Sequence, residues 1–267
     1  MKLLQDRPIG IFDSGVGGLT VARSIRRYLP AEDIIYFGDT ARVPYGNKSR
    51  NTIIRFSREI MDFLMKDNVK AVVVACNTAS SLSLSSLKLI YPVPVIGVIK
   101  PGLKEAISIL QAKRIGVIGT NSTIESLAYE KEARRIDPAV RIFSKSCPLF
   151  VPLVENRFVN DEITELVAEK YLKNFKNKKL DALILGCTHY PILKTVIKRV
   201  LNNVQLIDSS YAVAREIEKV LREKKIASDT GKKNGSMKCF VSDDAEGFRK
   251  TAGIFLKQRI KVKKVNL

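Results

Sequence analysis

Short apolar runs alternate along this chain with segments of helical periodicity, and this alternation limits the fold more than any other feature. Residues 8–12, 33–37 and 71–75 are strand-like, whereas 17–29 and 53–65 carry apolar residues at helical spacing. Strands separated by amphipathic helices form βαβ units, in which helices cover both faces of a parallel sheet. We therefore predict an α/β fold with mainly parallel sheets flanked by helices.

The pattern also repeats within the chain. Residues 9–14 resemble residues 115–120, and an apolar run that ends in a cysteine follows each of them at a similar distance. Residues 93–97 and 203–208 are also loosely similar to each other. Landmarks in the same order predict two similar α/β lobes. We expect the first lobe to comprise 1–98 plus 210–267, and the second to comprise 99–209.

Composition restricts the class of protein. No apolar stretch among the 267 residues is long enough to cross a bilayer, and the first residues lack the apolar core of a secretory signal. We expect a cytoplasmic protein that does not enter a membrane. The net charge of +19 permits a basic nucleic-acid-binding protein, but the excess is spread over several segments without interleaved aromatic residues. Attraction of anionic substrates is the favoured interpretation.

Two cysteines stand in matching surroundings. Cys76 and Cys187 each follow a short apolar run and a small residue, and each precedes polar residues that include, in the second copy, the only histidine, His189. A thiol at the start of a helix is expected to have a lowered pKa, and a neighbouring histidine can share its proton. Packing is the alternative for either cysteine alone. Two thiols facing one site could remove a proton from one face of a carbon and return it on the other.

The remaining cysteines suggest no further chemistry. Cys147 and Cys239 are expected to be packing residues, because free cysteine behaves as a small buried apolar group. No two of the four cysteines form a C-x-x-C pair, so we predict neither a zinc site nor a disulfide framework. A metal site at Cys187 and His189 lacks clear further ligands, and we predict no metal.

Two glycine-containing loops follow predicted strands and so should lie at the carboxyl edge of a sheet, where ligands bind. The loop at 13–18 does not fit a dinucleotide fingerprint, and Asp13 suits an ammonium group or a proton relay, with a helix cap as the alternative. In Pro44-Tyr45-Gly46, backbone amides and the Tyr45 hydroxyl could hold a carboxylate, although a structural turn is nearly as plausible.

Four stretches carry a resemblance to a known family. In chain order they are GIFDSGVGGLT (10–20), DTARVPYG (39–46), ACNTA (75–79) and GCTHYP (186–191). Together they resemble the cofactor-independent aspartate/glutamate racemase family over essentially the whole chain. The resemblance implies interconversion of L- and D-glutamate, which supplies D-glutamate for peptidoglycan, without pyridoxal phosphate or metal. It also implies two α/β lobes with the active site in the cleft between them.

The resemblance also implies roles for individual residues. Cys76 would act on D-glutamate with help from Asp13, and Cys187 would act on L-glutamate with help from His189. Glu155, an ordinary surface carboxylate by spacing alone, falls where the family places a carboxylate. The substrate-binding set implied in the same way is Asp13, Ser14, Pro44, Tyr45, Gly46, Asn77, Thr78, Thr120, Thr188 and His189.

The partners expected on this basis are L- and D-glutamate and a second copy of the chain in a homodimer. Two alternatives stay open from the sequence. One is a racemase for another acidic amino acid, such as aspartate, and the other is a nucleic-acid-binding protein that uses the basic surface.

Overall fold

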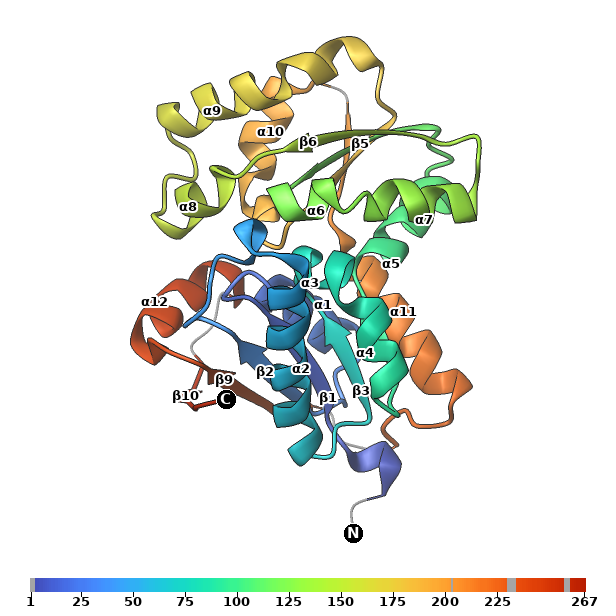
Figure 1. The fold of residues 1–267 in the computed structure, drawn as a ribbon, viewed down its shortest axis with the longest axis vertical. Coiled ribbons are helices and arrows are strands. Elements are labelled where there is room, and N and C mark those ends of the chain that lie inside the picture. Colours follow the sequence, from blue (N-terminus) through green and yellow to red (C-terminus); the bar gives the residue numbers. More distant parts are fainter. Residues whose placement is uncertain (1–2, 203, 230–233, 257–259) are drawn as a thin grey trace.

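The fold consists of two α/β lobes stacked along the long axis of the molecule (Figure 1). In the computed structural model, residues 3–202, 204–229, 234–256 and 260–267 are described. The first lobe contains a six-stranded sheet of order β10-β9-β2-β1-β3-β4, and the second contains a four-stranded sheet of order β6-β5-β7-β8. All pairs of neighbouring strands are parallel. The predicted fold class is confirmed.

The strands are β1 (Ile9–Asp13), β2 (Ile34–Gly38), β3 (Ala71–Val74), β4 (Val95–Gly97), β5 (Arg114–Gly119), β6 (Arg141–Ser146), β7 (Ala182–Gly186), β8 (Gln205–Ile207), β9 (Met237–Val241) and β10 (Val262–Lys264). The α-helices are α1 (Leu19–Tyr28), α2 (Arg50–Lys66), α3 (Asn77–Leu82), α4 (Leu84–Ile90), α5 (Ile99–Lys104), α6 (Asn121–Glu125), α7 (Ala128–Ile136), α8 (Phe150–Glu155), α9 (Glu162–Leu172), α10 (Lys194–Val200), α11 (Ser209–Glu223) and α12 (Ala245–Leu256). Short 3-10 helices are η1 (Leu4–Asp6), η2 (Tyr45–Asn47), η4 (Lys173–Lys178) and η5 (Tyr190–Leu193), and η3 (Glu105–Ile109) is a π-helix.

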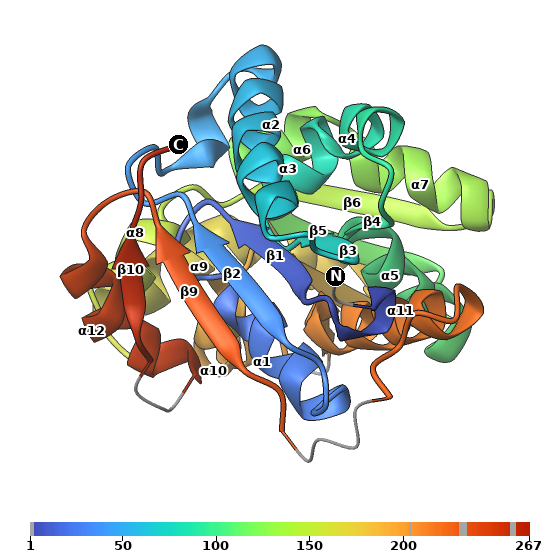
Figure 2. The ribbon, with the colours of Figure 1, turned by 90° about the horizontal axis from the view of Figure 1, so that it is seen from below.

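The six-stranded sheet is buried on both faces, which explains the continuous apolar runs of its central strands. On one face, Phe12 and Val74 pack with residues of α2 such as Ile60. On the other face, Ile11 belongs to a core that includes Ile25 of α1 and continues without a break into the second lobe. Figure 2 shows the strands of this sheet side by side, with helices on either side.

The chain crosses between the lobes at α5 and returns at α11, and these two helices pack against each other. Strands β9 and β10 then complete the sheet of the first lobe. We propose the lobe boundaries stated above, 1–98 with 210–267 and 99–209, as the division of the chain into folding units.

Three local features differ from the sequence-based expectation. The polar-looking segment at 141–146, for which no strand was predicted, forms the edge strand β6. The basic segment 257–264, in which no strand was predicted, contributes β10, although residues 257–259 lie outside the described part of the chain. Residue 203 of the 203–208 landmark and residues 230–233, before β9, also lie outside the described part of the chain.

The helix expected to begin beyond Cys76 divides at Ser83 into α3 and α4. The Ser83 hydroxyl donates to the carbonyl oxygen of Ala79 at 2.7 Å and to Ser57 Oγ at 2.9 Å. A side chain that bonds back to the preceding turn bends a helix, which accounts for the division.

No helix in the described ranges combines the length and apolar character that a membrane crossing needs.

A buried ion pair lies at the amino-terminal edge of the first sheet. Lys70 Nζ is 2.5 Å from a carboxylate oxygen of Glu32, and both side chains are almost wholly inaccessible to solvent. Lys70 also donates to the carbonyl oxygen of Gln5 at 2.7 Å, and Glu32 accepts from the backbone N–H of Ser228 at 2.8 Å. The pair therefore ties η1 and the segment after α11 to the sheet.

We predict that Lys70→Met destabilises the protein by about 3–5 kcal/mol, because it leaves the Glu32 carboxylate buried without its counter-charge. Urea unfolding followed by circular dichroism measures the change. The double variant Lys70→Met/Glu32→Leu should recover most of the loss, because no unpaired charge then remains. Equal destabilisation in the single and double variants would contradict the importance of this pair.

Candidate active site

The carboxyl ends of strands from both lobes meet at one cavity. Because all strands in each sheet are parallel, the loops after β1, β2, β3, β5 and β7 lie at the same edge of their sheets. Side chains from these loops, together with one from α8, line the cavity: Ser14, Val43, Pro44, Tyr45, Gly46, Cys76, Asn77, Thr78, Thr120, Val151, Cys187, Thr188 and His189.

Cys76 comes from the first lobe. It lies after β3 and caps the short helix α3, and its Sγ is 3.8 Å from Ser14 Oγ. Burial raises the pKa of the Cys76 thiol to about 12, and the nearby Asp13 carboxylate adds to this effect. The expectation that the helix start would lower the pKa of this thiol is wrong. Removal from water and a neighbouring negative charge outweigh the dipole of so short a helix.

Cys187 comes from the second lobe, after β7. Its Sγ is 3.8 Å from Nδ1 of His189, whose Nε2 lies 3.0 Å from Oε1 of Glu155 on α8. Burial alone would lower the pKa of His189, but the hydrogen bonds to Cys187 and Glu155 raise it to about 10. The raised pKa of His189 favours the imidazolium form, which lies between the sulfur of Cys187 and the carboxylate of Glu155.

Asp13 lies behind the cavity wall rather than in it. Its carboxylate accepts a hydrogen bond from the N–H of Gly15 at 3.1 Å, and the Thr188 hydroxyl approaches its other oxygen at 3.4 Å. Burial raises the pKa of Asp13, while the positive charge of His189 opposes the shift. The side chain is fully buried, so it reaches the cavity through Thr188 and through its effect on Cys76.

The loop after β2 is held by a buried carboxylate that we did not single out from the sequence. Asp39 accepts hydrogen bonds from the Tyr45 hydroxyl, from Arg42 Nε at 2.7 Å and from Ser242 Oγ at 2.8 Å. These bonds fix the ring of Tyr45 and the turn at Gly46 against the cavity. Asp39 stands inside a recognisable motif, but its partner Ser242 lies some two hundred residues away in sequence, so the spacing gave no signal of the contact.

The seam between the lobes is tight beside the cavity. A side chain at Gly17 would place its Cβ 2.8 Å from Nδ1 of His189, and one at Gly46 would place its Cβ 2.6 Å from that of Thr120. Both distances are far below van der Waals contact. Glycine is therefore required at these two positions for the lobes to approach as they do.

Hydrogen bonds cross the same seam. The hydroxyls of Thr78 and Thr120 are 2.9 Å apart, and Ser122 Oγ donates to the carbonyl oxygen of Gly46 at 2.9 Å. The buried Tyr129 hydroxyl, from α7, donates to Oδ1 of Asn77 at 2.7 Å. Because the amide oxygen is engaged in this way, the amide nitrogen of Asn77 is available to a ligand in the cavity.

The cavity is small. Its volume is about 30 Å³, which suffices for one or two water molecules and for nothing the size of an amino acid. Any larger ligand must therefore enter through a movement of the seam.

The structure brings most of the sequence-predicted site residues to this cavity. Two of them, Asp13 and Glu155, do not line it and act on lining residues instead. Two apolar wall residues, Val43 and Val151, were not predicted, because single valines in a loop and a helix carry no pattern. Within the described ranges there is no group of three or more His, Cys, Asp or Glu side chains that could hold a metal ion.

The chain is similar to known racemases over almost its entire length. Residues 9–217 match the Asp/Glu/hydantoin racemase family model. A glutamate racemase from Geobacter metallireducens is 47% identical over 251 residues, which cover 94% of this chain and 93% of that protein.

Solved structures agree. A glutamate racemase isoform from Bacillus anthracis superposes with a TM-score of 0.95 at 39% identity, covering 98% of both chains. The Francisella tularensis glutamate racemase, solved in complex with D-glutamate, gives 0.91 at 40% identity, covering 98% of this chain and 97% of that one. Two thiols of opposite lobes meeting at one cavity and this similarity lead to the same conclusion: the chain belongs to the Asp/Glu/hydantoin racemase family.

Proposed function

We propose that this protein interconverts L- and D-glutamate by proton transfer at the α-carbon, with Cys76 and Cys187 as the two bases, and that it supplies D-glutamate for peptidoglycan. The observation that carries the proposal is that one thiol from each lobe lines the same cavity. Relatives named glutamate racemase at 39–47% identity support glutamate as the substrate.

From L-glutamate, the Cys187 thiolate takes the α-proton and becomes a thiol, and the electron pair of the broken C–H bond stays on the α-carbon. The Cys76 thiol then gives its proton to the opposite face, which forms D-glutamate and leaves a thiolate at Cys76. The reverse reaction exchanges the two roles. No proton or electron is gained or lost overall.

The electrostatics suit this starting state. The raised pKa of Cys76 favours its protonated form, which can donate, and the raised pKa of His189 favours a positive charge 3.8 Å from Cys187 Sγ. An unequal pair is required, because one group must be a base when the other is an acid. In the reverse reaction, from D- to L-glutamate, Asp13 assists Cys76 by sharing the proton of its thiol.

Loss of the α-proton places negative charge on the α-carboxylate, which fixed hydrogen-bond donors must stabilise. We assign this role to Ser14, Asn77, Thr78, Thr120 and Thr188, together with the backbone of the Pro44-Tyr45-Gly46 turn. Because two thiols and their neighbours provide both proton transfers, we propose that the reaction uses neither pyridoxal phosphate nor a metal.

Substrate entry requires that the lobes separate at the seam, since the cavity of about 30 Å³ cannot hold glutamate. Closure then removes water from the thiolate, which strengthens every electrostatic interaction within the site. We also propose a homodimer and a cytoplasmic location, which the family resemblance implies.

The direct test is incubation of reduced protein with L-glutamate in D₂O, with L-aspartate in parallel. We expect loss of optical rotation and α-deuterium in the inverted product for glutamate alone. Racemisation of aspartate instead would reassign the substrate, and no reaction with either would overturn the proposal.

We predict that Cys76→Ser and Cys187→Ser each lower racemisation by about 10²–10⁴-fold, because each removes the acid or base on one face. Optical rotation in both directions measures the effect. Cys239→Ala, a buried cysteine away from the cavity, is the matched control and should retain the wild-type rate. A single-thiol variant that racemises as fast as the wild type would refute the two-base mechanism.

Tyr129→Phe should raise KM for glutamate about tenfold and change kcat less, because Asn77 loses the partner that orients its amide, a loss of about 1–3 kcal/mol. Steady-state kinetics separate the two constants. Tyr91→Phe is the control, since it loses an exposed hydroxyl bond to Asp62 far from the cavity. An unchanged KM in Tyr129→Phe would show that the hydroxyl does not position Asn77.

The pH profile tests the Cys187–His189–Glu155 arrangement. In the wild type, kcat/KM for L-glutamate should fall as the pH rises through about 10, where the imidazolium loses its proton and the thiolate is left without a counter-charge beside an anionic substrate. Glu155→Gln removes a carboxylate that raises the pKa of His189, so this fall should move to lower pH. The control Glu162→Gln, on the exposed start of α9, should leave the profile in place, and an unmoved limb in Glu155→Gln would contradict the assignment.

A further inference from the structure

Strand β6 is the outer strand of the second sheet, and only one of its edges is paired. The N–H groups of Arg141 and Cys147, at its two ends, donate toward β5, to Lys113 and Gly119 respectively, both at 2.8 Å. In a parallel ladder alternate residues bond to the same neighbour. The odd-numbered residues therefore pair with β5, and the backbone N–H and C=O groups of Ile142 and Ser144 point away from the sheet.

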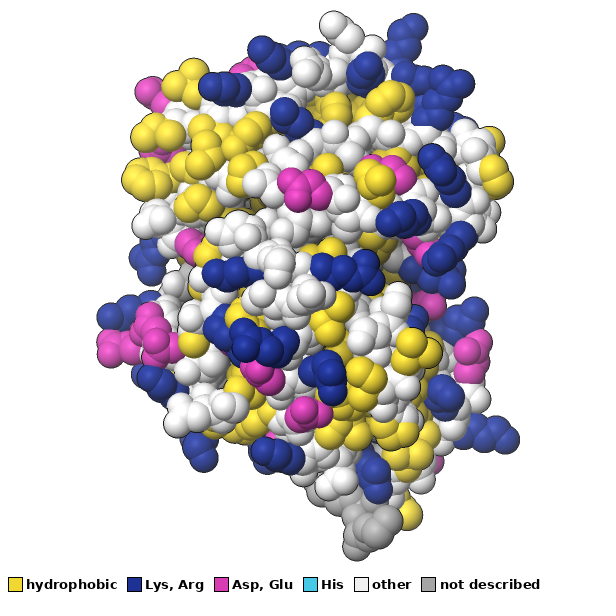
Figure 3. Space-filling model, in the orientation of Figure 1, with side chains coloured by type: hydrophobic (Ala, Val, Ile, Leu, Met, Phe, Trp, Pro, Cys, Tyr) yellow, Lys and Arg dark blue, Asp and Glu magenta, His cyan; other side chains and the backbone are white. Residues whose placement is uncertain are grey.

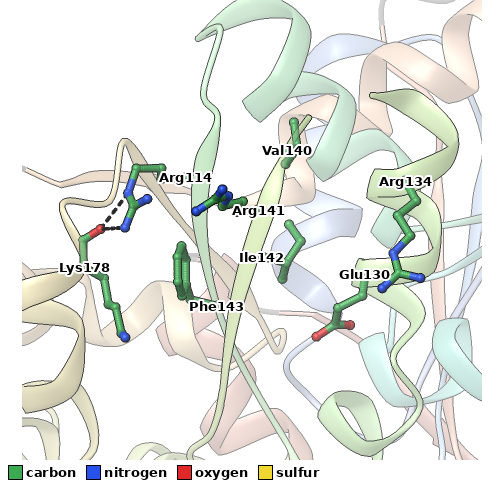
Figure 4. A pocket seen from close by; sticks show the side chains of 8 residues that line it. All are labelled: Arg114, Glu130, Arg134, Val140, Arg141, Ile142, Phe143 and Lys178. Carbon is green, nitrogen blue, oxygen red and sulfur yellow. Dashed lines mark hydrogen bonds between the residues drawn. The ribbon is translucent and has the colours of Figure 1, made fainter. Parts of the chain in front are cut away.

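A pocket of about 430 Å³ surrounds this open edge. Figure 4 shows Arg141 and Phe143 on one side of β6 together with Arg114 and Lys178, and Ile142 on the other side toward α7. Four of the charged side chains that line the pocket are basic and one, Glu130, is acidic. In Figure 3, which views the molecule as in Figure 1, basic side chains gather at the loop end of β6 and α7.

Much of this positive charge is unpaired. The acidic member, Glu130, accepts a hydrogen bond from Ser144 Oγ at 2.6 Å and forms no ion pair with an arginine of the described part of the chain. The side chains of Arg134 and Arg141 are exposed and make no hydrogen bond or ion pair with any described residue. One lies on each side of the strand.

We propose that the open edge of β6 binds an extended acidic segment of another protein, which adds to the sheet as a further strand. Backbone hydrogen bonds to Ile142 and Ser144 would give affinity, and the side chains would give specificity. Because strand side chains alternate, acidic residues would face Arg141, Arg114 and Lys178, and the intervening apolar residues would face Ile142. The ligand class is therefore a peptide with alternating acidic and apolar residues.

Two other occupants fit less well. A second copy of this chain that paired with this edge through its own β6 would bring Arg134 and Arg141 against their counterparts, and these like charges repel. Single-stranded nucleic acid needs an open aromatic face for base stacking. The Phe143 ring instead lies under Arg114, with the guanidinium carbon 5.1 Å from the ring centre, and near Lys178 Nζ at 5.6 Å.

The test measures fluorescence anisotropy of a labelled peptide of alternating glutamate and valine, matched in length to β6, with the full-length protein. Arg141→Glu should weaken binding about tenfold, and Arg134→Glu should weaken it less, because Arg134 lies on the side of the strand that would meet the apolar residues. Lys198→Glu, an exposed charge reversal on α10 of the same lobe, should leave binding unchanged. All three variants should keep the wild-type racemase rate, because none of these residues lines the active-site cavity.

A second measurement separates strand addition from simple charge attraction. In an extended peptide, alternate residues point their backbone N–H groups to opposite edges of the strand. Two versions of the peptide are therefore made, one N-methylated on the residues of one edge and the other on the residues of the opposite edge. The version methylated on the edge that faces β6 should bind about tenfold more weakly or not at all, while the other should bind as the parent peptide does. Equal binding of both versions, unchanged binding in Arg141→Glu, or displacement of the peptide by oligo(dT) with tighter binding of the oligonucleotide would each overturn the proposal.

Discussion

The opposition of two parallel sheets across a tight seam governs this molecule. Each sheet delivers its loops to its carboxyl edge, and the two edges meet where Gly17 and Gly46 allow the lobes to come within van der Waals contact. The thiols, the hydroxyls and His189 all reach one cavity because of this arrangement. Any side chain larger than hydrogen at those glycines would push the lobes apart and separate the groups that must act on one carbon.

The two thiols differ in their surroundings even though their sequence contexts match. Cys76 is buried near the Asp13 carboxylate, which favours the thiol, whereas Cys187 Sγ lies 3.8 Å from the ring of His189, whose pKa is raised to about 10. A symmetrical pair would have either two protons or none to exchange. The asymmetry comes from residues outside the cavity, Asp13 behind one thiol and Glu155 behind the histidine of the other, so the wall of the site controls its chemistry.

The inner and outer strands of the second sheet differ in burial. The inner strands, β5 and β7, are mostly buried and apolar, whereas β6 contains two basic, two apolar and two serine residues and leaves one edge without a partner strand among the described residues. A long unpaired edge is a hazard for self-association, and a high positive charge is one protection against it. The same charge makes the edge selective for an acidic strand.

Sequence periodicity was sufficient for the α/β class, because fully buried strands must be apolar runs and their covering helices must be amphipathic. It missed β6, because an edge strand with exposed basic residues has no such run, and it missed the division of the helix after Cys76 at Ser83. The order of the motifs was sufficient to predict most of the residues that line the cavity, because each motif lies at the end of a strand in a parallel sheet.

What the sequence determined alone is therefore the order of the strand-ending motifs and which side chains are candidates for the chemistry. Only the tertiary structure decided the surroundings of each thiol. The pKa of Cys76 depends on its burial and on Asp13, which lies far away in sequence, and the helix-start rule predicted the wrong direction. Electrostatic environment is a property of distances through space, and these distances exist only once the two lobes have packed together.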